Sequence, residues 1–310
     1  MDLRLIARDG VFSTADAARL GLDRNALGRL VRDGRCTRLD TGWYAVVEGE
    51  RPTGEPFHRL RALALGRGLC DRAALSHHSR LLVSGLPVFA ADLATVHLTS
   101  LAESRGGVSV GRRGVAVHRK VADLHLPEVL STSGEVLARA PLGVPVAWAC
   151  VQAGLLGGPE AFVVSSDAAL RTGVIEATDL AAAVRLFSGH TGIGPVRAAV
   201  DVVDGRHESP GESRTAFLLT ALGYTVEPQL EVVAEGRLYR PDFRIAGTRV
   251  LVEFDGAVKY EDRRALFQEK QREDALRRAG WVVVRLVWAD LADPVRVARR
   301  VAAALAASAA

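Results

Sequence analysis

Two neighbouring stretches, LYRPDFRI at residues 238–245 and RVLVEFDG at residues 249–256, decide the fold of the C-terminal third of the chain. Both read as β-strands, and the Ala-Gly-Thr sequence between them is short enough for a hairpin. Side chains alternate between the two faces of a strand, so Glu253 and Asp255 point the same way, opposite to the apolar residues between and before them. With Asp242 on the adjacent strand, three carboxylates are expected to converge on one point.

These carboxylates predict a magnesium site. Charged groups at the end of an otherwise apolar strand are costly to bury without a cation or a basic partner. Mg²⁺ takes oxygen ligands from a few carboxylates and leaves its other positions to water and phosphate, so Asp242, Glu253 and Asp255 are predicted to bind Mg²⁺ or Mn²⁺. In the alternative interpretation the acids stand at a sheet edge in salt bridges with Arg240, Arg249 or Arg285.

The elements around the two strands occur in an order that points to a known superfamily. Helices are predicted over 208–222, 262–278 and 294–306, and strands over 226–233, 238–245, 249–254 and 281–286. The resulting α-β-β-β-α-β core, with Pro241-Asp242 on its second strand and an acid on its third, resembles the PD-(D/E)XK nucleases and their restriction-endonuclease-like fold. Within that superfamily, the Glu-x-Asp-Gly strand and the charged helix after it are similar to proteins related to very-short-patch-repair endonucleases, over residues 210–291.

The resemblance implies metal-dependent hydrolysis of DNA phosphodiester bonds. Carried over by position, Asp242 and Glu253 are metal ligands, and Glu212 matches an acid that many members supply from the opening helix. One or two Mg²⁺ ions in such a site lower the pKa of a bound water and neutralise charge on the phosphate. The catalytic candidates on these acidic positions are therefore Glu212, Asp242, Glu253 and Asp255.

One position departs from the superfamily pattern. The pattern has a lysine two residues after the strand-three acid, and this chain has Asp255 there. We expect Lys259, in the loop after the strand, or Lys270, on the charged helix, to supply the positive charge that stabilises the transition state. Arg272 and Asp274 lie on the same helix as Lys270 and are expected near the site.

Residues 1–50 read as a winged helix-turn-helix. Helices are predicted over 14–20, capped by Ser13 or Thr14, and over 24–33, capped by Asp23, with a wing hairpin over 37–47. The N-terminal half of a recognition helix meets base edges, and basic residues on a wing meet phosphates. The residues expected to bind DNA are Arg24, Asn25, Arg29, Arg32, Arg35 and Arg38. The alternative is a small structural module with a solvated basic face.

A second resemblance covers this segment and two short motifs C-terminal to it. Residues 1–50, with ALSHH at 74–78 and GLP at 85–87, resemble AbiEi-type antitoxins of type IV toxin–antitoxin systems. The resemblance implies that the winged domain acts as a DNA-binding autorepressor and that a cognate toxin is a partner. His77 and His78 have no partner at metal-ligand spacing, so we expect them to be helix residues with ordinary hydrogen bonds. Ser76 beside His77 lacks an identifiable orienting acid and is not expected to be a nucleophile.

The bulk properties fit an α/β protein of several domains. The chain has 310 residues, is 48% hydrophobic and 25% charged, and carries a formal net charge of +4, which permits nucleic acid without requiring it. We expect a DNA-binding domain over 1–50, a mixed α+β region over 51–207, with helices over 55–69 and 73–86, and an endonuclease-like domain over 208–310. Three widely spaced cysteines and the lack of a signal peptide or membrane span favour a cytoplasmic protein.

Two functions from different classes fit these observations. The first is a DNA endonuclease directed by its own winged helix, in defence or repair. The second is an antitoxin-like transcriptional repressor whose nuclease fold is inactive and serves as a binding or homodimerisation module. The retained Asp242–Glu253 pair favours the enzyme, and the absent strand-three lysine favours the repressor; we prefer the enzyme. RNA remains open as a substrate, because no feature of the sequence distinguishes it from DNA.

Overall fold

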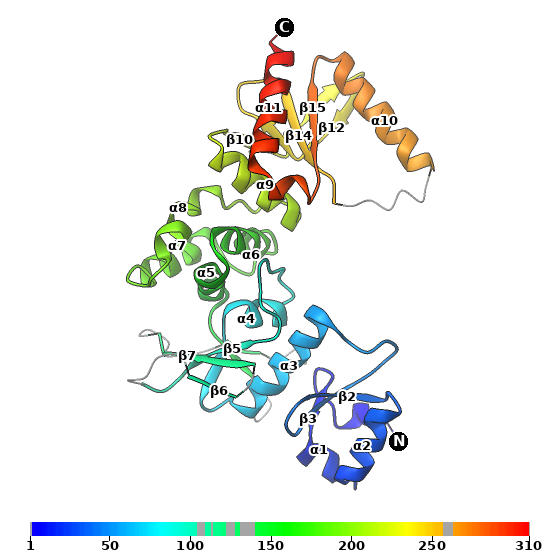
Figure 1. Cartoon of the computed structure of the whole chain (residues 1–310), viewed down its shortest axis with the longest axis vertical. Helices are drawn as coiled ribbons and strands as arrows, with labels where there is room; N and C mark the ends of the chain where they lie inside the picture. The colour runs from blue at the N-terminus through cyan, green and yellow to red at the C-terminus, as the bar shows by residue number, and fades with distance from the viewer. Residues whose placement is uncertain are drawn as a thin grey trace.

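The chain forms an extended row of three regions, with the N-terminal and C-terminal regions at opposite ends and the middle region between them (Figure 1). The computed structural model describes residues 2–103, 109–112, 114–121, 128–130, 140–256 and 263–309, and of these the side chains at 109–112 and 263–270 are left undescribed. Within these ranges, no helix is long and apolar enough to span a membrane.

The N-terminal region combines two short helices with a small antiparallel sheet, as in a winged helix-turn-helix. Its elements are η1 (Leu3–Leu5), β1 (Val11–Ser13), α1 (Thr14–Arg19), α2 (Arg24–Arg32), β2 (Cys36–Asp40) and β3 (Trp43–Val46), and the strand order is β1-β3-β2. Ser13, rather than Thr14, caps α1: its Oγ accepts from the Asp16 N–H, and the Asp16 carboxylate accepts from the Ser13 N–H in return. Asp23 caps α2 through the Ala26 N–H at 2.7 Å, which confirms the second cap.

The middle region places a six-stranded sheet beside a layer of helices. Its helices are α3 (Gly54–Gly68), α4 (His77–Val83), α5 (Val146–Gly157), α6 (Pro159–Arg171), α7 (Ala177–Leu186), α8 (Ile193–Ala198) and the 3₁₀ turn η2 (Val200–Val202). Its strands are β4 (Ala73–Leu75), β5 (Val96–Ser100), β6 (Ser109–Arg112), β7 (Val115–His118), β8 (Glu128–Val129) and β9 (Leu142–Gly143), in the order β6-β7-β5-β4-β9-β8.

The predicted helix over 73–86 is wrong in its first turn. Ala73, Ala74 and Leu75 favour a helix by propensity, but they form the buried strand β4, paired with β5 on one side and β9 on the other. Tertiary pairing overrides a weak local preference at these positions. The helix starts only at His77, whose backbone has a φ of +53°, an uncommon value for a residue that is not glycine.

The C-terminal region packs helices against a four-stranded mixed sheet. Its elements are α9 (Pro210–Ala221), β10 (Val226–Pro228), β11 (Val232–Ala234), β12 (Arg237–Tyr239), β13 (Phe243–Ile245), β14 (Val250–Phe254), α10 (Arg263–Arg278), β15 (Val282–Leu286), η3 (Asp290–Ala292) and α11 (Pro294–Ser308). The sheet order is β10-β13-β14-β15, with β14 and β15 parallel. Phe243, Val250 and Val252 form its core with residues of α9 and α11.

Two predicted strands are each divided in this region. The strands expected over 226–233 and 238–245 break around Gln229, which has a φ of +55°, and around Pro241, which has no backbone N–H to donate. The residues between these breaks form the separate two-stranded hairpin β11–β12. Without that hairpin, the sheet and its helices have the predicted order α-β-β-β-α-β.

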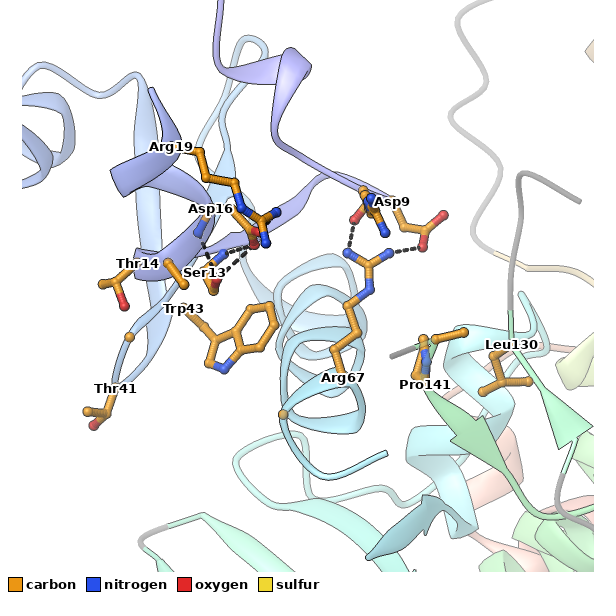
Figure 2. Close-up of a pocket in the computed structure, with 15 residues that line it drawn as sticks. Asp9, Ser13, Thr14, Asp16, Arg19, Thr41, Trp43, Arg67, Leu130 and Pro141 are labelled. Carbon is orange, nitrogen blue, oxygen red and sulfur yellow. Dashed lines mark hydrogen bonds and ion pairs between the residues drawn. The ribbon is translucent and has the colours of Figure 1, made fainter. Parts of the chain in front are cut away.

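The winged-helix region is tied to α3 by a buried arginine. Arg67 donates from Nη2 to the Asp9 carboxylate at 2.5 Å and from Nη1 to the Arg8 carbonyl at 2.7 Å. Figure 2 shows these bonds beside a cavity of about 740 Å³, with Trp43 and Pro141 on its walls. The cavity lies away from the carboxylates that the sequence predicts to be catalytic.

Candidate active site

Asp242 lies where the predicted site requires it, at the entrance to β13 and beside the end of β14. Phe243 pairs with Val252 in antiparallel register, so Asp242 and Glu253 occupy the next positions along their strands. The Phe254 N–H donates to Asp242 Oδ2 at 2.7 Å, which fixes the carboxylate against β14. Strand pairing therefore brings the two acids together, as the sequence predicts.

The pKa of Asp242 is shifted by its surroundings. Its pKa is raised from 3.8 to about 6, chiefly by burial and also by the negative charges of Glu212 and Glu253, against the opposing effects of the Phe254 N–H and Arg272. Like charges disfavour ionisation of a carboxyl group, and a nearby cation restores it. The residues around Asp242 thus fit a divalent cation, which would relieve this repulsion.

Glu253 is held by two arginines. Arg272 donates from Nη2 to Glu253 Oε1 at 2.6 Å, and Arg285, the partner of Glu253 in the β14–β15 ladder, places its Nη2 3.8 Å from Oε2. Of the three arginines in the salt-bridge alternative, Arg285 therefore contacts Glu253, while Arg249 donates to the Ala279 carbonyl. Asp242 and Glu253 are therefore neighbouring acids, and Glu253 is also paired with two arginines.

Glu212 both caps helix α9 and acts on the charge of Asp242. It stands in the first turn of α9, where Ser209 Oγ donates to Oε1 and the Glu208 N–H donates to Oε2, each at 2.8 Å. These bonds belong to the cap of α9, yet the charge of Glu212 also acts on Asp242. Gly211 makes this possible, because a Cβ there would lie 1.9 Å from Cε1 of Phe254. Only a glycine lets the start of α9 approach the end of β14 this closely.

The remaining acid, Asp255, continues the strand direction just beyond β14. Its N–H donates to the Leu286 carbonyl at 2.7 Å, extending the ladder to β15. Within the described ranges, Asp242, Glu253 and Asp255 do not bring three ligand atoms within 4.8 Å of one another. The assignment of these three residues as metal ligands stays a prediction.

Among the described side chains of α10, Arg272 brings positive charge beside Glu253. Lys259 lies outside the described residues, as does the side chain of Lys270, although its backbone belongs to α10. Arg272, further along the same helix, reaches Glu253, whereas Asp274 is exposed. The sequence signal for this contact was the place of Arg272 on the charged helix, which packs against β15.

The six residues expected to bind DNA share one property: all are exposed. They lie on α2, in the turn after it and on β2, and they are Arg24, Asn25, Arg29, Arg32, Arg35 and Arg38. On the opposite face of α2, Leu27 and Leu30 are buried in the core of the N-terminal region. The helix therefore presents a basic surface at the end of the molecule that is remote from the carboxylates (Figure 1).

The structure confirms His77 and His78 as helix residues but gives His77 partners at metal-ligand distance, which the sequence did not predict. Each makes a hydrogen bond of the ordinary kind, His77 Nδ1 with Ser76 Oγ at 2.9 Å and His78 Nε2 with the Thr95 carbonyl at 3.3 Å. However, His77 also gathers with His97 and His118, so that one ligand atom from each lies within 4.8 Å of the others. The strands that carry His97 and His118 are distant in sequence, which is why spacing along the chain did not reveal them.

Comparisons with known proteins include relatives that span almost the whole chain. The chain is 27% identical over 287 residues to "Uncharacterized protein Rv2248" of Mycobacterium tuberculosis (strain ATCC 25618 / H37Rv), covering 91% of this chain and 96% of the relative. The same values hold for "Uncharacterized protein MT2308" of M. tuberculosis (strain CDC 1551 / Oshkosh).

Among solved structures, the "Homing Endonuclease I-Bth0305I Catalytic Domain" matches 32% of this chain and 97% of its own, with a TM-score of 0.27 and 16% identity. In the N-terminal region, residues 3–47 match the family model described as "Transcriptional regulator, AbiEi antitoxin". The winged-helix region is therefore similar to the regulator domain of AbiEi antitoxins.

Proposed function

We propose that this protein is a divalent-metal-dependent DNA endonuclease, in which residues 1–50 bind DNA, residues 51–207 connect and position, and residues 208–310 cut. The observation that carries the proposal is the state of Asp242. It is a carboxyl group raised to a pKa of about 6 between Glu212 and Glu253, on strands whose order matches the predicted nuclease core. A strongly perturbed acid beside other acids is typical of a functional site.

The chemistry assigned to the site rests on its charges. Asp242 and Glu253 hold Mg²⁺ or Mn²⁺, with Asp255 as a further oxygen ligand, and the ion supplies an activated water and a Lewis acid for the phosphate. The negative charge of Glu212 lowers the electrostatic potential at Asp242 and so favours a cation there. Arg272 stands beside Glu253 and is placed to meet negative charge on the phosphodiester, the role predicted for Lys259 or Lys270.

A second function has its own observation. Glu253 is already neutralised by Arg272 and Arg285, an arrangement that a purely structural ion-pair network also produces. Together with the regulator family that residues 3–47 match, this supports a transcriptional repressor with an inactive nuclease fold. Under that function a homodimer and a cognate toxin are the expected partners, and DNA binding by α2 is retained.

Cleavage of supercoiled plasmid and of single-stranded DNA tests the enzyme directly. We expect nicking by the wild type with Mg²⁺ or Mn²⁺, and its loss in Asp242→Ala and in Glu253→Ala. Glu231→Ala, which removes an exposed carboxylate of the same region, is the matched control and should cut normally. Cleavage that survives in both site variants would contradict the assignment, and a folded wild type that cuts neither DNA nor RNA would favour the repressor.

DNA binding is tested separately by a mobility shift on random duplex. Arg24→Ala with Arg29→Ala is expected to weaken binding and to flatten its dependence on salt, because fewer phosphate contacts release fewer counterions. Arg171→Ala with Arg185→Ala, which removes two exposed arginines at the ends of α6 and α7, serves as the charge-matched control. Equal loss of binding in the control would show a non-specific charge effect rather than an interface.

A further inference from the structure

The middle region contains a concentration of histidines that neither DNA binding nor phosphodiester hydrolysis uses. Five of the eight histidines of the chain contact one another there, with ring centroids 3.9–5.2 Å apart. This histidine cluster consists of His58, His77, His78, His97 and His118. Burying several imidazoles together is costly, because each ring nitrogen that is removed from water needs a hydrogen-bond or metal partner in the protein. The cluster therefore indicates a specific chemical role.

Three members of the cluster come from three elements that the sheet brings together. His77 is the first residue of α4, directly after β4; His97 lies on β5; and His118 ends β7. The strands β5 and β7 are parallel neighbours, with Thr99 opposite His118 and His97 opposite Ala116, so both histidines lie on one face of the sheet. The Ser76 N–H donates to the His97 carbonyl and brings the start of α4 to the same face.

We propose that His77, His97 and His118 form a binding site for a divalent transition-metal ion of the zinc class. One ligand atom from each histidine already lies within 4.8 Å of the other two. A tetrahedral zinc ion with Zn–N bonds of about 2.0–2.1 Å holds its nitrogens roughly 3.3 Å apart, so modest side-chain rotations complete the site. A water molecule takes the fourth position, as in other three-histidine zinc sites.

The three rings are in the protonation state that metal binding requires. Burial lowers the pKa of His97 to about 3 and of His118 to about 4, and it holds the pKa of His77 well below the ordinary value. His97 Nδ1 and His118 Nε2 face each other at 2.8 Å, so one of these nitrogens offers its lone pair to the other. A cation between them would accept both lone pairs in place of this hydrogen bond.

The surroundings of His77 hold its ring in position. Ser76 Oγ bonds Nδ1 at 2.9 Å, which assigns Nε2 to the ion, and Gln152 accepts from the His77 backbone N–H at 3.3 Å. Gln152 also donates to Thr99 on β5 at 3.4 Å, linking the two sides of the site. Outer partners of this kind orient metal-binding histidines. The left-handed backbone of His77, which is strained for a residue with a Cβ, adds an independent sign of a functional constraint.

An ion can reach the site from solvent. His118 is only half-buried, and His97 forms part of the wall of a cavity of about 250 Å³ together with His78 and Asp92. The ligand set also selects the ion: imidazole nitrogens suit Zn²⁺, Cu²⁺ or Ni²⁺, whereas Mg²⁺ and Ca²⁺ prefer oxygen. The three-histidine site is therefore chemically distinct from the carboxylates of the C-terminal region.

The test uses the full chain, freed of metal with a chelator and titrated with Zn²⁺ against a chromophoric chelator. We expect one zinc ion per chain at micromolar affinity or tighter, an intense visible absorption when Co²⁺ replaces it, and a zinc-dependent rise in the unfolding midpoint that Mg²⁺ does not produce. His97→Ala and His118→Ala should each weaken zinc binding at least ~100-fold, beyond the effect of losing an outer partner. Asp242→Asn with Glu253→Gln should leave the zinc stoichiometry at one.

Two further variants keep the test decisive. His118→Gln preserves a polar side chain at the half-buried strand end, and circular dichroism shows whether each variant folds. His190→Ala removes an exposed histidine after α7 and should bind zinc like the wild type. Unchanged zinc affinity in folded His118→Gln and His97→Ala would overturn the proposal, as would a folded wild type that binds no zinc. Equal weakening by His190→Ala would show adventitious surface binding and overturn it also.

Discussion

The carboxylates of the C-terminal region and the histidine cluster of the middle region are built from opposite chemistry. The first group, Glu212, Asp242, Glu253 and Asp255, offers hard oxygens framed by Arg272 and Arg285; the second offers neutral nitrogens surrounded by other rings. Their electrostatics differ in the same sense: burial raises the pKa of Asp242 and lowers that of every histidine in the cluster. Burial makes the uncharged form easier in both, but only the histidines bind metal in that form.

This difference has a consequence for how each site prepares for a cation. Neutral imidazoles carry little electrostatic cost in the absence of an ion, so three of them already lie close together. Carboxylates repel one another when ionised, and in the C-terminal region Glu253 is paired with Arg272 while the pKa of Asp242 is raised toward its neutral form. A site built from acids is expected to contract when metal arrives, whereas the three-histidine site needs only local rotation.

The largest expected effect separates the two sites by their ligands. Asp242→Ala should reduce Mg²⁺-dependent nicking at least ~100-fold, because losing a metal ligand costs more than losing one of its outer partners. The same variant should bind zinc as the wild type does, since Asp242 lies beside the four-stranded sheet of the C-terminal region and the histidines lie at the six-stranded sheet of the middle region. The measurements are plasmid nicking rates and zinc titration on one preparation. Loss of zinc binding in Asp242→Ala would join the two sites and break the comparison.

The two sites could be predicted from the sequence to unequal degrees, for a physical reason. Asp242 and Glu253 lie on strands joined by a short hairpin, so period-two alternation was sufficient to place them side by side. The caps at Ser13 and Asp23 were equally local, and the structure confirms both. His97 and His118 meet His77 only through the order of a six-stranded sheet, which no local pattern encodes.

The errors in the predicted elements have two different origins. The strand β4, formed by Ala73–Leu75, exists because β5 and β9 pair with it, although its residues favour a helix. The break at Pro241 was visible in the sequence as a proline inside a strand pattern, and proline within a strand marks an edge or a bulge. The contact between Gly211 and Phe254 had no sequence signal beyond the glycine itself.

The next largest effect concerns the close approach that only the carboxylate site needs. Gly211→Ala places a Cβ 1.9 Å from Cε1 of Phe254, so the ring of Phe254 or the start of α9 must shift. We expect a loss of about 2–3 kcal/mol in the free energy of unfolding, typical of overpacking, together with weaker nicking. Chemical denaturation followed by tryptophan fluorescence measures the stability change. Gly194→Ala, at a helical glycine with open space around it, is the control and should change stability little.

A smaller effect tests whether the arginine frame of Glu253 belongs to catalysis or to structure. Arg272→Ala should lower nicking about 10-fold by removing the cation beside Glu253, in the range seen for partners of metal ligands. Arg272→Lys restores the charge without the planar fork and should recover part of the rate. A structural role predicts the reverse order of effects: a large loss of stability in Arg272→Ala and no selective loss of nicking.

The smallest effect concerns the pH dependence of stability, which should have opposite signs for Asp242 and His118. In chelator-treated protein, Asp242 has a pKa of about 6 in the folded state against an ordinary value of 3.8, so the folded form takes up this proton first. The stability due to Asp242 therefore rises as the pH falls through 6 toward 3.8. His118 has a folded pKa of about 4 against an ordinary 6.5, so the unfolded chain is protonated first and stability is lost as the pH falls below 6.5.

Matched variants isolate these opposite slopes from the other titrating groups. Urea unfolding of the wild type, Asp242→Asn and His118→Gln is compared at pH values above and below the pKa of Asp242. Asp242→Asn should be more stable than the wild type at neutral pH and lose that advantage in acid, whereas His118→Gln should lose less stability in acid than the wild type does. Each difference is on the order of 1 kcal/mol after screening by water. Slopes of the same sign would mean that folding does not favour the uncharged form at one of the two sites, and the electrostatic contrast between them would no longer hold.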